Sequence, residues 1–368
     1  MTSVDTVDIA STTEQIARRM HANPELSLEE YEASAACCDF LRAVGYEVQQ
    51  GVAGLETAFV AATTIGTGGD LCIGLAAEFD ALPNVGHGCG HHLIAGGVLE
   101  AAARLFETRP GNGVLKVFGT PAEEIAAGKI RMLEAGLFEG VDAVVTYHPL
   151  DGPGVFGHLN GCAILDLTFK GKATHAASTP WDGRSAQDGA ALAEHAIGME
   201  RQYFRESERL HGIVTEVRGA HNVFPDLAVL RVNCRAPTAT GLARLVDRVK
   251  TIANGAALAT ATTVEVEMFQ LIQPYDGHEG LARLAWKAMD LPDGTEYTFA
   301  GSTDLGDISQ VVPTVTVTET GWTPTTWHAP ELHAAAGEDP AYESMHRAAD
   351  AMVAITTMLL EGDNSWKT

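Results

Sequence analysis

Six side chains that can bind a metal ion or transfer a proton lie within one glycine-rich stretch, residues 76–97, which reads AAEFDALPNVGHGCGHHLIAGG. They are Glu78, Asp80, His87, Cys89, His91 and His92. Thiolate, imidazole and carboxylate groups are the ligands that zinc and related divalent metals take in proteins. Cysteine is usually a core residue, but a cysteine two residues from a histidine, among glycines, is not typical of a core segment. The stretch therefore predicts a metal site.

Three further candidates follow two other apolar segments. Glu123 and Glu124 come directly after the apolar run 114–119, and His148 comes directly after the apolar run 141–147. Adjacent acidic residues are common at helix starts, where they interact favourably with the helix dipole. Here they follow a predicted buried strand, and Cys89 and His91 lie on the neighbouring loop. We therefore expect one glutamate to bind metal and the other to act as a general base toward water.

The set of candidate ligands is large enough for two metal ions. Two carboxylates and three histidines accompany Cys89, the third histidine being either His328 or His333 from the last part of the chain. A mixed sulfur, nitrogen and oxygen set suits a divalent transition metal. We expect one or two divalent ions per chain, manganese or zinc in the first place, with cobalt or nickel as alternatives.

The elements that must position these side chains alternate between predicted strands and helices. Apolar runs at 71–79, 114–119 and 141–147 predict buried strands, and a helix is predicted at 93–107 and another after Glu123. Alternation of this kind is typical of a mostly parallel sheet, whose carboxyl-end crevice is where active sites form. We therefore predict an α/β fold with the candidate ligands at one edge of the sheet.

The pattern changes between about residues 159 and 272. Predicted strands at 162–171, 211–219, 226–236 and 262–269 alternate with predicted helices at 184–203 and 242–257. The order β-α-β-β-α-β is that of a ferredoxin-like module. We therefore predict a discontinuous metal-binding catalytic domain, residues 1–158 and 273–368, with a complete small domain, residues 159–272, inserted into it.

The two ends of the chain are predicted to complete the larger domain. A helix is predicted at 13–20, and a second one begins at Ser27, where Ser27 and Glu30 have the spacing of a capping box, and ends at Val44. The tail carries a predicted strand at 311–318 and a closing amphipathic helix at 343–360.

Composition excludes some classes of partner. The 368-residue chain has a net charge of −24, which repels nucleic acid and anionic membrane surfaces. No secretory signal and no apolar run long enough to span a bilayer are visible in the sequence. The six cysteines lack the spacing of a disulfide framework, so we expect reduced thiols and a cytoplasmic location.

Five segments together resemble the M20 metallopeptidase family. They read AEFDALPNVGHGCGHHLIAGG, GTPAEEIAAGKIRMLEAGLFEGVDAVVTYHP, FKGKATHAASTPWDGRSAQDGA, HNVFPDLAVLRVNCRAPT and GSTDLGDISQVVP. Within the family the chain is most similar to the amidohydrolase and aminoacylase branch, in the subgroup of p-aminobenzoyl-glutamate hydrolase subunits and intracellular dipeptidases. The resemblance implies that the inserted domain acts as a lid and joins two chains in a homodimer.

The resemblance also implies roles for the residues of the larger domain. The metal ligands it implies are Cys89, His91, Glu124, His148 and a C-terminal histidine. Glu123 matches the general base, and Asp80 matches an acid that stands behind the metal and orients a ligand. His328 fits the subgroup's arrangement and is favoured as the last ligand, while His333 fits the looser pattern of other aminoacylases.

Three residues of the inserted domain match positions that act on substrate in relatives. His175 matches a histidine that reaches the partner subunit's site and stabilises the developing oxyanion. Asn222 and Arg235 match contacts to the substrate's amide oxygen and carboxylate, although a surface salt bridge is an alternative for Arg235. His92 departs from the family, since most relatives carry Asn or Asp there. We count His92 among the candidate substrate contacts, with an extra metal ligand and a side chain pointing away as alternatives.

These residues predict a metal-dependent hydrolase that cleaves the C–N amide bond of a small N-acyl amino acid, a dipeptide or an aryl amide. Hydrolytic removal of an amine from an aromatic ring is an alternative for the same site. A binding protein that kept the fold and lost catalysis is a second alternative. The complete set of Cys89, His91, Glu123, Glu124 and His148 argues against it, because such a set has little purely structural use.

Overall fold

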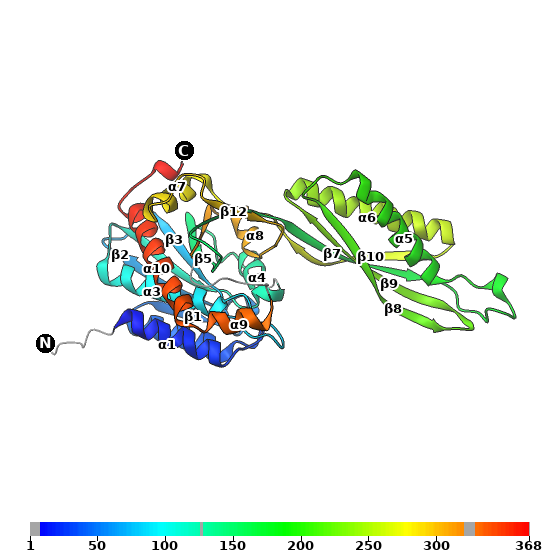
Figure 1. Ribbon diagram of the computed structural model, residues 1–368, viewed down its shortest axis with the longest axis horizontal. Coiled ribbons are helices and arrows are strands. Elements are labelled where there is room, and N and C mark those ends of the chain that lie inside the picture. The colour runs from blue at the N-terminus through cyan, green and yellow to red at the C-terminus, as the bar shows by residue number, and fades with distance from the viewer. Residues whose placement is uncertain (1–7, 126–127, 320–327, 368) are drawn as a thin grey trace. The chain divides into compact units, whose positions relative to one another are not determined.

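The computed structural model describes residues 8–125, 128–319 and 328–367. The chain forms two compact units, coloured along the chain in Figure 1. The first comprises Met1–His158, Asp276–Thr298 and Asp307–Thr368, and the second comprises Leu159–Tyr275 and Phe299–Gly306. The segment Phe299–Gly306 thus belongs to the second unit, whereas the sequence predicts it as part of the catalytic domain.

The first unit is built on a mixed sheet that has nine strands in the described residues, in the order β1-β2-β4-β3-β5-β13-β6-β11, with β12 paired to β6. The central strands β4, β3, β5 and β13 are mutually parallel, which confirms the predicted α/β class with a mostly parallel centre. The strand bounds are β1 Glu47–Gln50, β2 Phe59–Ile65, β3 Cys72–Ala77, β4 Gly113–Gly119, β5 Ala143–Tyr147, β6 Gly154–Leu159, β11 Tyr275–Asp276, β12 Glu296–Phe299 and β13 Thr314–Thr318.

Helices pack against this sheet and bury its central strands. All six residues of β3 are buried, and so are all five of β5, which explains why their sequences are apolar without alternation. The core helix α3 (His91–Thr108) packs against α10 (Asp339–Leu360) and α1 (Ile9–Ala22). Gly96 permits the α3–α10 contact, because a Cβ atom there would lie 2.4 Å from the sulfur of Met345. The other helices of this unit and its connections are α2 Tyr31–Val44, α4 Gly128–Glu134, α7 Glu279–Ala288, α8 Leu305–Ser309 and α9 Pro330–Ala336.

The predicted start of the second helix is wrong. Helix α2 begins at Tyr31 rather than at Ser27, and Glu30 precedes it without a side-chain cap. The Ser27 hydroxyl donates instead to Asp80 Oδ2 at 2.7 Å. Glu30 accepts hydrogen bonds from the backbone of Leu28 and Ala122, at 2.9 and 2.8 Å. Both side chains have buried tertiary partners, which outcompete the local capping box.

The second unit has a four-stranded antiparallel sheet in the described residues, in the order β10-β7-β9-β8. Its elements follow the chain as β7 Gly161–Lys170, α5 Ala186–Glu200, β8 Arg209–Ala220, β9 Val223–Ala236, α6 Ala239–Thr260 and β10 Thr263–Ile272. This is the predicted β-α-β-β-α-β succession. Helices α5 and α6 cover one face of the sheet (Figure 1), and from Ala228 to Ala236 the residues of β9 alternate between buried and half-buried as that arrangement requires.

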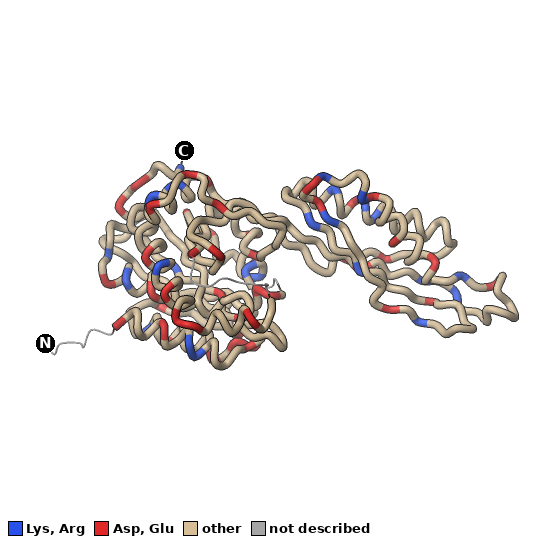
Figure 2. Tube along the Cα trace, in the orientation of Figure 1, with Lys and Arg blue, Asp and Glu red and all other residues tan. Residues whose placement is uncertain are grey.

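Among the described helices, none combines the length and apolarity that crossing a bilayer requires. Acidic residues are distributed over both units (Figure 2), in keeping with the net charge of −24.

Candidate metal centre

The candidate ligands of the first unit follow the carboxyl ends of three neighbouring parallel strands. Glu78 and Asp80 follow β3, Glu123 and Glu124 follow β4, and His148 follows β5. His91 begins α3, directly after Gly90, whose φ of 77° is the left-handed conformation that glycine adopts without strain. Three separate strand ends and one helix start therefore present their side chains at the same edge of the sheet.

The first group of ligand atoms, the Cys89 group, consists of Cys89, His91 and Glu124. Their thiol, imidazole and carboxylate atoms all lie within 4.8 Å of one another. His328, just before α9, adds a fourth side chain: its Nε2 lies 3.0 Å from Cys89 Sγ and 3.9 Å from Glu124 Oε2. A set of one sulfur, two nitrogens and a carboxylate is suited to a divalent transition metal.

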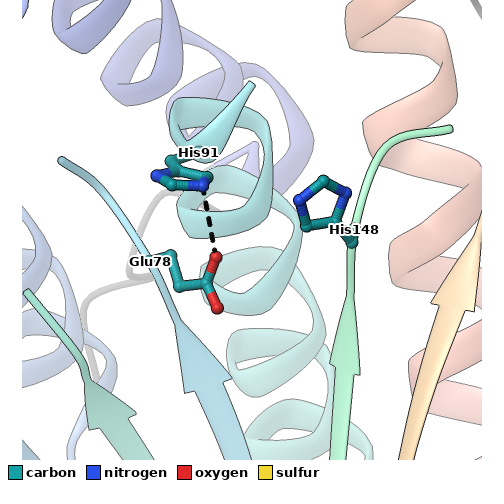
Figure 3. A group of neighbouring side chains, drawn as sticks. All are labelled: Glu78, His91 and His148. Carbon is teal, nitrogen blue, oxygen red and sulfur yellow. Dashed lines mark ion pairs between the residues drawn. The ribbon is translucent and has the colours of Figure 1, made fainter. Parts of the chain in front are cut away.

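The second group, the His148 group, consists of Glu78, His91 and His148 (Figure 3), whose ligand atoms also lie within 4.8 Å of one another. Glu78 Oε2 lies 3.5 Å from His91 Nε2. Glu78 lies in the predicted metal-binding stretch, but no role was predicted for it from the sequence. The signal that could have identified it is its position as the first residue after the buried strand β3, at the edge where the other ligands lie.

Several buried ligand atoms in the two groups have no hydrogen-bond partner among the residues that the structure describes. They are Glu78 Oε2, His91 Nε2 and Glu124 Oε1. Buried polar atoms are nearly always satisfied, so each exception in a native structure calls for an explanation. Three such atoms on side chains of two adjoining ligand groups fit a site built to hold cations.

Asp80 fixes the orientation of His91. The Nδ1 atom of His91 lies 3.0 Å from the Asp80 carbonyl oxygen and 3.2 Å from Asp80 Oδ1, so Nδ1–H donates to Asp80. The other ring nitrogen, Nε2, faces the Glu78 carboxylate at 3.5 Å. The Asp80 carboxylate also accepts from Ser27 and from the Glu124 backbone N–H. Burial opposes ionisation of Asp80, but the hydrogen bonds from His91 and Ser27 lower its pKa to about 2. Orienting carboxylates of this kind are common behind metal-bound histidines.

Burial raises the pKa of the Cys89 thiol to about 12. Burial alone would lower the pKa of His91, but its hydrogen bond with Asp80 and its interactions with Cys89 and Glu124 raise that pKa well above 6.5. Cysteine binds metal as a thiolate and histidine as a neutral imidazole, so metal binding at these residues is coupled to proton release.

Glu123 differs from the ligand candidates in its access to solvent. Its side chain is 14% exposed, against 6% for Glu124, and its Oε2 lies 3.8 Å from His91 Nε2. Because Glu123 is more exposed than Glu124, a water molecule from solvent can reach its carboxylate more easily. Both glutamates are thus largely buried, and Glu123 is the more exposed of the two.

Residues 74–357 match the sequence profile described as Peptidase family M20/M25/M40. The chain belongs to this family. The predicted family is therefore confirmed, and the chain is a hydrolase. Family membership and the complete set of Cys89, His91, Glu123, Glu124 and His148 both argue against the alternative of a binding protein without catalysis.

Relatives of this M20 hydrolase include dipeptidases and amide hydrolases. The mouse Xaa-Arg dipeptidase is 34% identical over 326 residues, which cover 81% of this chain and 74% of the relative. A p-aminobenzoyl-glutamate hydrolase of Escherichia coli is 31% identical in one of its subunits over 323 residues, which cover 82% of this chain and 66% of the relative.

Solved structures share the fold. A protein described as a putative aminohydrolase from methicillin-resistant Staphylococcus aureus superposes with a TM-score of 0.80 at 21% identity, covering 96% of both chains. A Bacillus subtilis protein described as a dinuclear metal binding peptidase of the M20 family superposes with a TM-score of 0.75 at 20% identity, covering 96% of this chain and 99% of that one.

The structure does not bring His92 into either ligand group of the M20 hydrolase. His92 is fully buried, and its Nε2 lies 3.0 Å from the carbonyl oxygen of Ala336 at the end of α9. Its ring lies against those of His87 and His21, with centroid distances of 4.7 and 4.9 Å. This environment matches the third alternative for His92, a side chain that points away from the site.

The two C-terminal histidines occupy different places. His328 contacts Cys89, whereas His333 stacks on His21 with a centroid distance of 4.2 Å. His333 Nδ1 also accepts a hydrogen bond from the His87 backbone at 3.1 Å. These distances associate His328, and not His333, with the Cys89 group.

The candidates of the second unit are displayed on its surface. His175 and Asn222 are exposed and lie on adjoining segments, because the Ala176 backbone donates to the Asn222 carbonyl oxygen at 2.9 Å. Arg235, on β9, donates to Ser302 Oγ at 3.0 Å and to the Ala300 carbonyl oxygen at 3.3 Å. Both of these acceptors are neutral, and within the described part of the chain Arg235 makes no salt bridge of the kind that the sequence left open.

Proposed function

We propose that this M20 hydrolase is a metal-dependent amidohydrolase. Its substrates would be small N-acyl amino acids, dipeptides or aryl amides, as the names of its relatives indicate. The observation that carries the proposal is the convergence of Cys89, His91, Glu124 and His148 with Glu123 at one sheet edge. One or two divalent ions, manganese or zinc in the first place, would be held by these ligands and by His328. A bound ion would polarise the substrate carbonyl and lower the pKa of water.

The side chains of the protein transfer the proton, orient a metal ligand and bind the substrate. Glu123 takes a proton from the attacking water and returns it to the leaving amine nitrogen, which is the duty of a general base that becomes a general acid. Asp80 holds His91 in one tautomer. His175 donates a hydrogen bond to the developing oxyanion. Asn222 and Arg235 bind the amide oxygen and the carboxylate of the substrate, the latter through the planar guanidinium group.

We also propose a cytoplasmic homodimer in which the second unit is the lid and the dimerisation domain. All six cysteines are free and buried, which is what a reducing compartment favours. Strand β8 is an edge of the four-stranded sheet, and its Ile213 and Val217 are 65% and 43% exposed. An unpaired edge with apolar side chains is suited to pairing with a second chain.

Replacing Glu123 by Gln tests the proposal. The amide cannot accept the proton, so we expect turnover to fall by roughly 10²- to 10⁴-fold, the usual contribution of a general base. Metal content, measured by mass spectrometry of the elements, should stay at the wild-type level. Unchanged turnover would exclude Glu123 as the base, and a wild-type enzyme that is indifferent to chelators would exclude the metal.

A panel of substrates identifies the bond that is cleaved. N-acyl amino acids, dipeptides and aminobenzoyl amides test amide hydrolysis, and aromatic amines test the deamination alternative. His92, the candidate that departs from the family pattern, lies outside both ligand groups. We therefore expect turnover of amides, and turnover of aromatic amines alone would overturn the proposal.

A further inference from the structure

Glu78 and Lys129 form a buried ion pair that the proposed mechanism does not use. Lys129 Nζ lies 2.8 Å from Glu78 Oε1, and the two side chains are 0% and 6% exposed. Lys129 belongs to α4, on the segment that follows the paired glutamates, and Glu78 follows β3. Isolated buried ion pairs are weak stabilisers, because the desolvation of two charges offsets their attraction. The pair therefore calls for a role other than stability.

The ion pair uses only one oxygen of the Glu78 carboxylate. Lys129 binds Oε1, whereas Oε2 is buried and has no hydrogen-bond partner within the described residues. This second oxygen faces His91 Nε2 at 3.5 Å (Figure 3). His91 Nε2 is likewise buried without a hydrogen-bond partner. Two ligands that share one tetrahedral metal ion at bond lengths of about 2.0–2.2 Å lie about 3.3 to 3.6 Å apart. The separation between these two atoms is thus that of ligands to a common ion.

Charge balance points the same way. With Cys89 as a thiolate, the two groups and their neighbours Asp80 and Glu123 contribute five negative charges, from Glu78, Asp80, Cys89, Glu123 and Glu124. Lys129 offsets one of these, and two divalent ions would offset the other four. Lys129 thus neutralises the fifth negative charge, which two divalent ions alone would leave uncompensated, and Glu78 keeps one oxygen for the metal.

We propose that Glu78 is a metal ligand in the His148 group and that Lys129 is the positioning residue that holds its carboxylate there. This inference rests on the proposed metal-dependent function. Lys129 fixes Oε1, so that Oε2 is directed at the ion shared with His91 and His148. Lys129 itself does not touch metal or substrate.

Metal binding by the full-length chain tests the inference. Wild type, Glu78→Gln, Lys129→Met and the double variant are loaded with zinc, passed through gel filtration and analysed for metal, and their affinities are measured against a competing chelator. We expect wild type to hold two ions and Glu78→Gln to bind one of them at least tenfold more weakly. Lys129→Met should weaken the same ion by roughly 10- to 100-fold, as the loss of an orienting partner does.

The double variant separates positioning from general electrostatics. If Lys129 acts through Glu78, then Lys129→Met changes nothing further in the Glu78→Gln background, because interacting residues are non-additive. The double variant leaves no buried charge without its partner, so it can fold even if Lys129→Met alone does not.

Two further variants serve as controls. Lys129→Arg, which retains the charge and the donor, should retain both ions. Lys170→Met, which breaks an exposed ion pair with Glu265 in the second unit, is the matched control and should bind metal as wild type does.

The outcomes for the inference and for the proposed function are distinguishable. A wild type without bound zinc contradicts the proposed function itself. A wild type with two ions whose affinities are unchanged in Glu78→Gln overturns the assignment of Glu78 as a ligand. If Lys129→Met lowers the metal affinity by the same factor in wild type and in the Glu78→Gln background, then Lys129 does not act through Glu78 and its positioning role is overturned.

Discussion

His91 and His92 are neighbours in the sequence, yet their side chains have separate environments. Successive residues of an α-helix are rotated by about 100°, so two adjacent side chains at the start of α3 cannot face the same site. His91 is oriented by Asp80 and faces both ligand groups. His92 lies among His21, His87 and Tyr342 and contacts the end of α9. Its departure from the family residue thus affects packing beneath the site.

Replacing His92 by Asn, the residue of many relatives, should therefore destabilise the fold. The shorter side chain cannot reach the Ala336 carbonyl oxygen and leaves this buried acceptor without its donor, which costs about 1–3 kcal/mol. Urea denaturation of the metal-loaded proteins measures the loss. His195→Asn, an exposed substitution on α5, is the control and should change stability by less than about 0.5 kcal/mol. A stable His92→Asn protein with altered substrate affinity would instead make His92 a substrate contact.

The sequence alone identified candidate ligands only where they follow a predicted buried strand or lie on the glycine-rich loop. Cys89, His91, Glu124 and His148 were identifiable because each lies beside a predicted buried strand or on the glycine-rich loop. The partnership of Glu78 with Lys129 was not, because 51 positions separate them and only the packing of α4 brings the ammonium group to Glu78. The same holds for Ser27, whose predicted local cap is replaced by a bond to Asp80.

At the scale of elements, three helices from distant parts of the chain are joined by one histidine. His346 of α10 contacts Glu100 of α3 through Nδ1 at 2.6 Å and Glu14 of α1 through Nε2 at 3.2 Å. Arg104 and Arg18 pair with the same two glutamates, at 3.2 and 2.6 Å. The hydrogen bond with Glu100 raises the pKa of His346 above 6.5, against the opposing effect of burial. A protonated imidazole at this position donates from both nitrogens and so ties the three helices together.

This linkage predicts how stability depends on pH. Because the pKa of His346 is higher in the folded protein than in the unfolded one, its contribution is fully present below about pH 6.5 and is lost as pH rises through the folded pKa. Urea denaturation of wild type and His346→Gln should show a difference that is largest near pH 6 and shrinks toward pH 9. Metal binding varies with pH in both proteins and cancels in the comparison. A difference that is constant with pH, or that grows with it, would contradict a protonated His346.

The sequence predicted the order of the strands and helices more accurately than the residues at which they begin and end. The β-α-β-β-α-β succession of the second unit is the predicted one, but α6 begins at Ala239 rather than at residue 242, after the cap Thr238, whose hydroxyl accepts from the Gly241 backbone. The assignment of Phe299–Gly306 to the second unit was not predictable, because it depends on tertiary contacts such as that between Arg235 and Ser302. Local pattern carries no information about such contacts.

At the scale of the whole molecule, the candidates for one reaction are divided between two units. The ligand groups and Glu123 belong to the first unit, and His175, Asn222 and Arg235 belong to the second. The net charge of −24, distributed over both units (Figure 2), makes long-range attraction of an anionic substrate unfavourable. Recognition of a substrate carboxylate must therefore come from a specific local cation, and Arg235, whose acceptors Ser302 and Ala300 are neutral, is suited to that task.

The proposed homodimer predicts that strand β8 carries the contact between chains. Lysines in place of Ile213 and Val217 would bring like charges together at a paired edge, so we expect sedimentation velocity to show a dimer for wild type and a monomer for the double variant. Leu271→Lys, at a 41% exposed position on the opposite edge strand β10, is the control and should remain a dimer. A monomeric wild type, or a dimer disrupted only by Leu271→Lys, would contradict the assignment of β8.

Mixing two inactive variants then tests whether one chain completes the site of the other. Glu123→Ala lacks the base, and His175→Ala lacks the proposed oxyanion donor. In a mixed dimer, the subunit that retains Glu123 receives His175 from its partner, so one of its two sites is complete. Random exchange makes half of the dimers mixed, and activity should recover to about a quarter of the wild-type level if His175 supplies most of the oxyanion stabilisation. If His175 served the site of its own chain, every site in the mixture would lack one of the two groups and no activity would return.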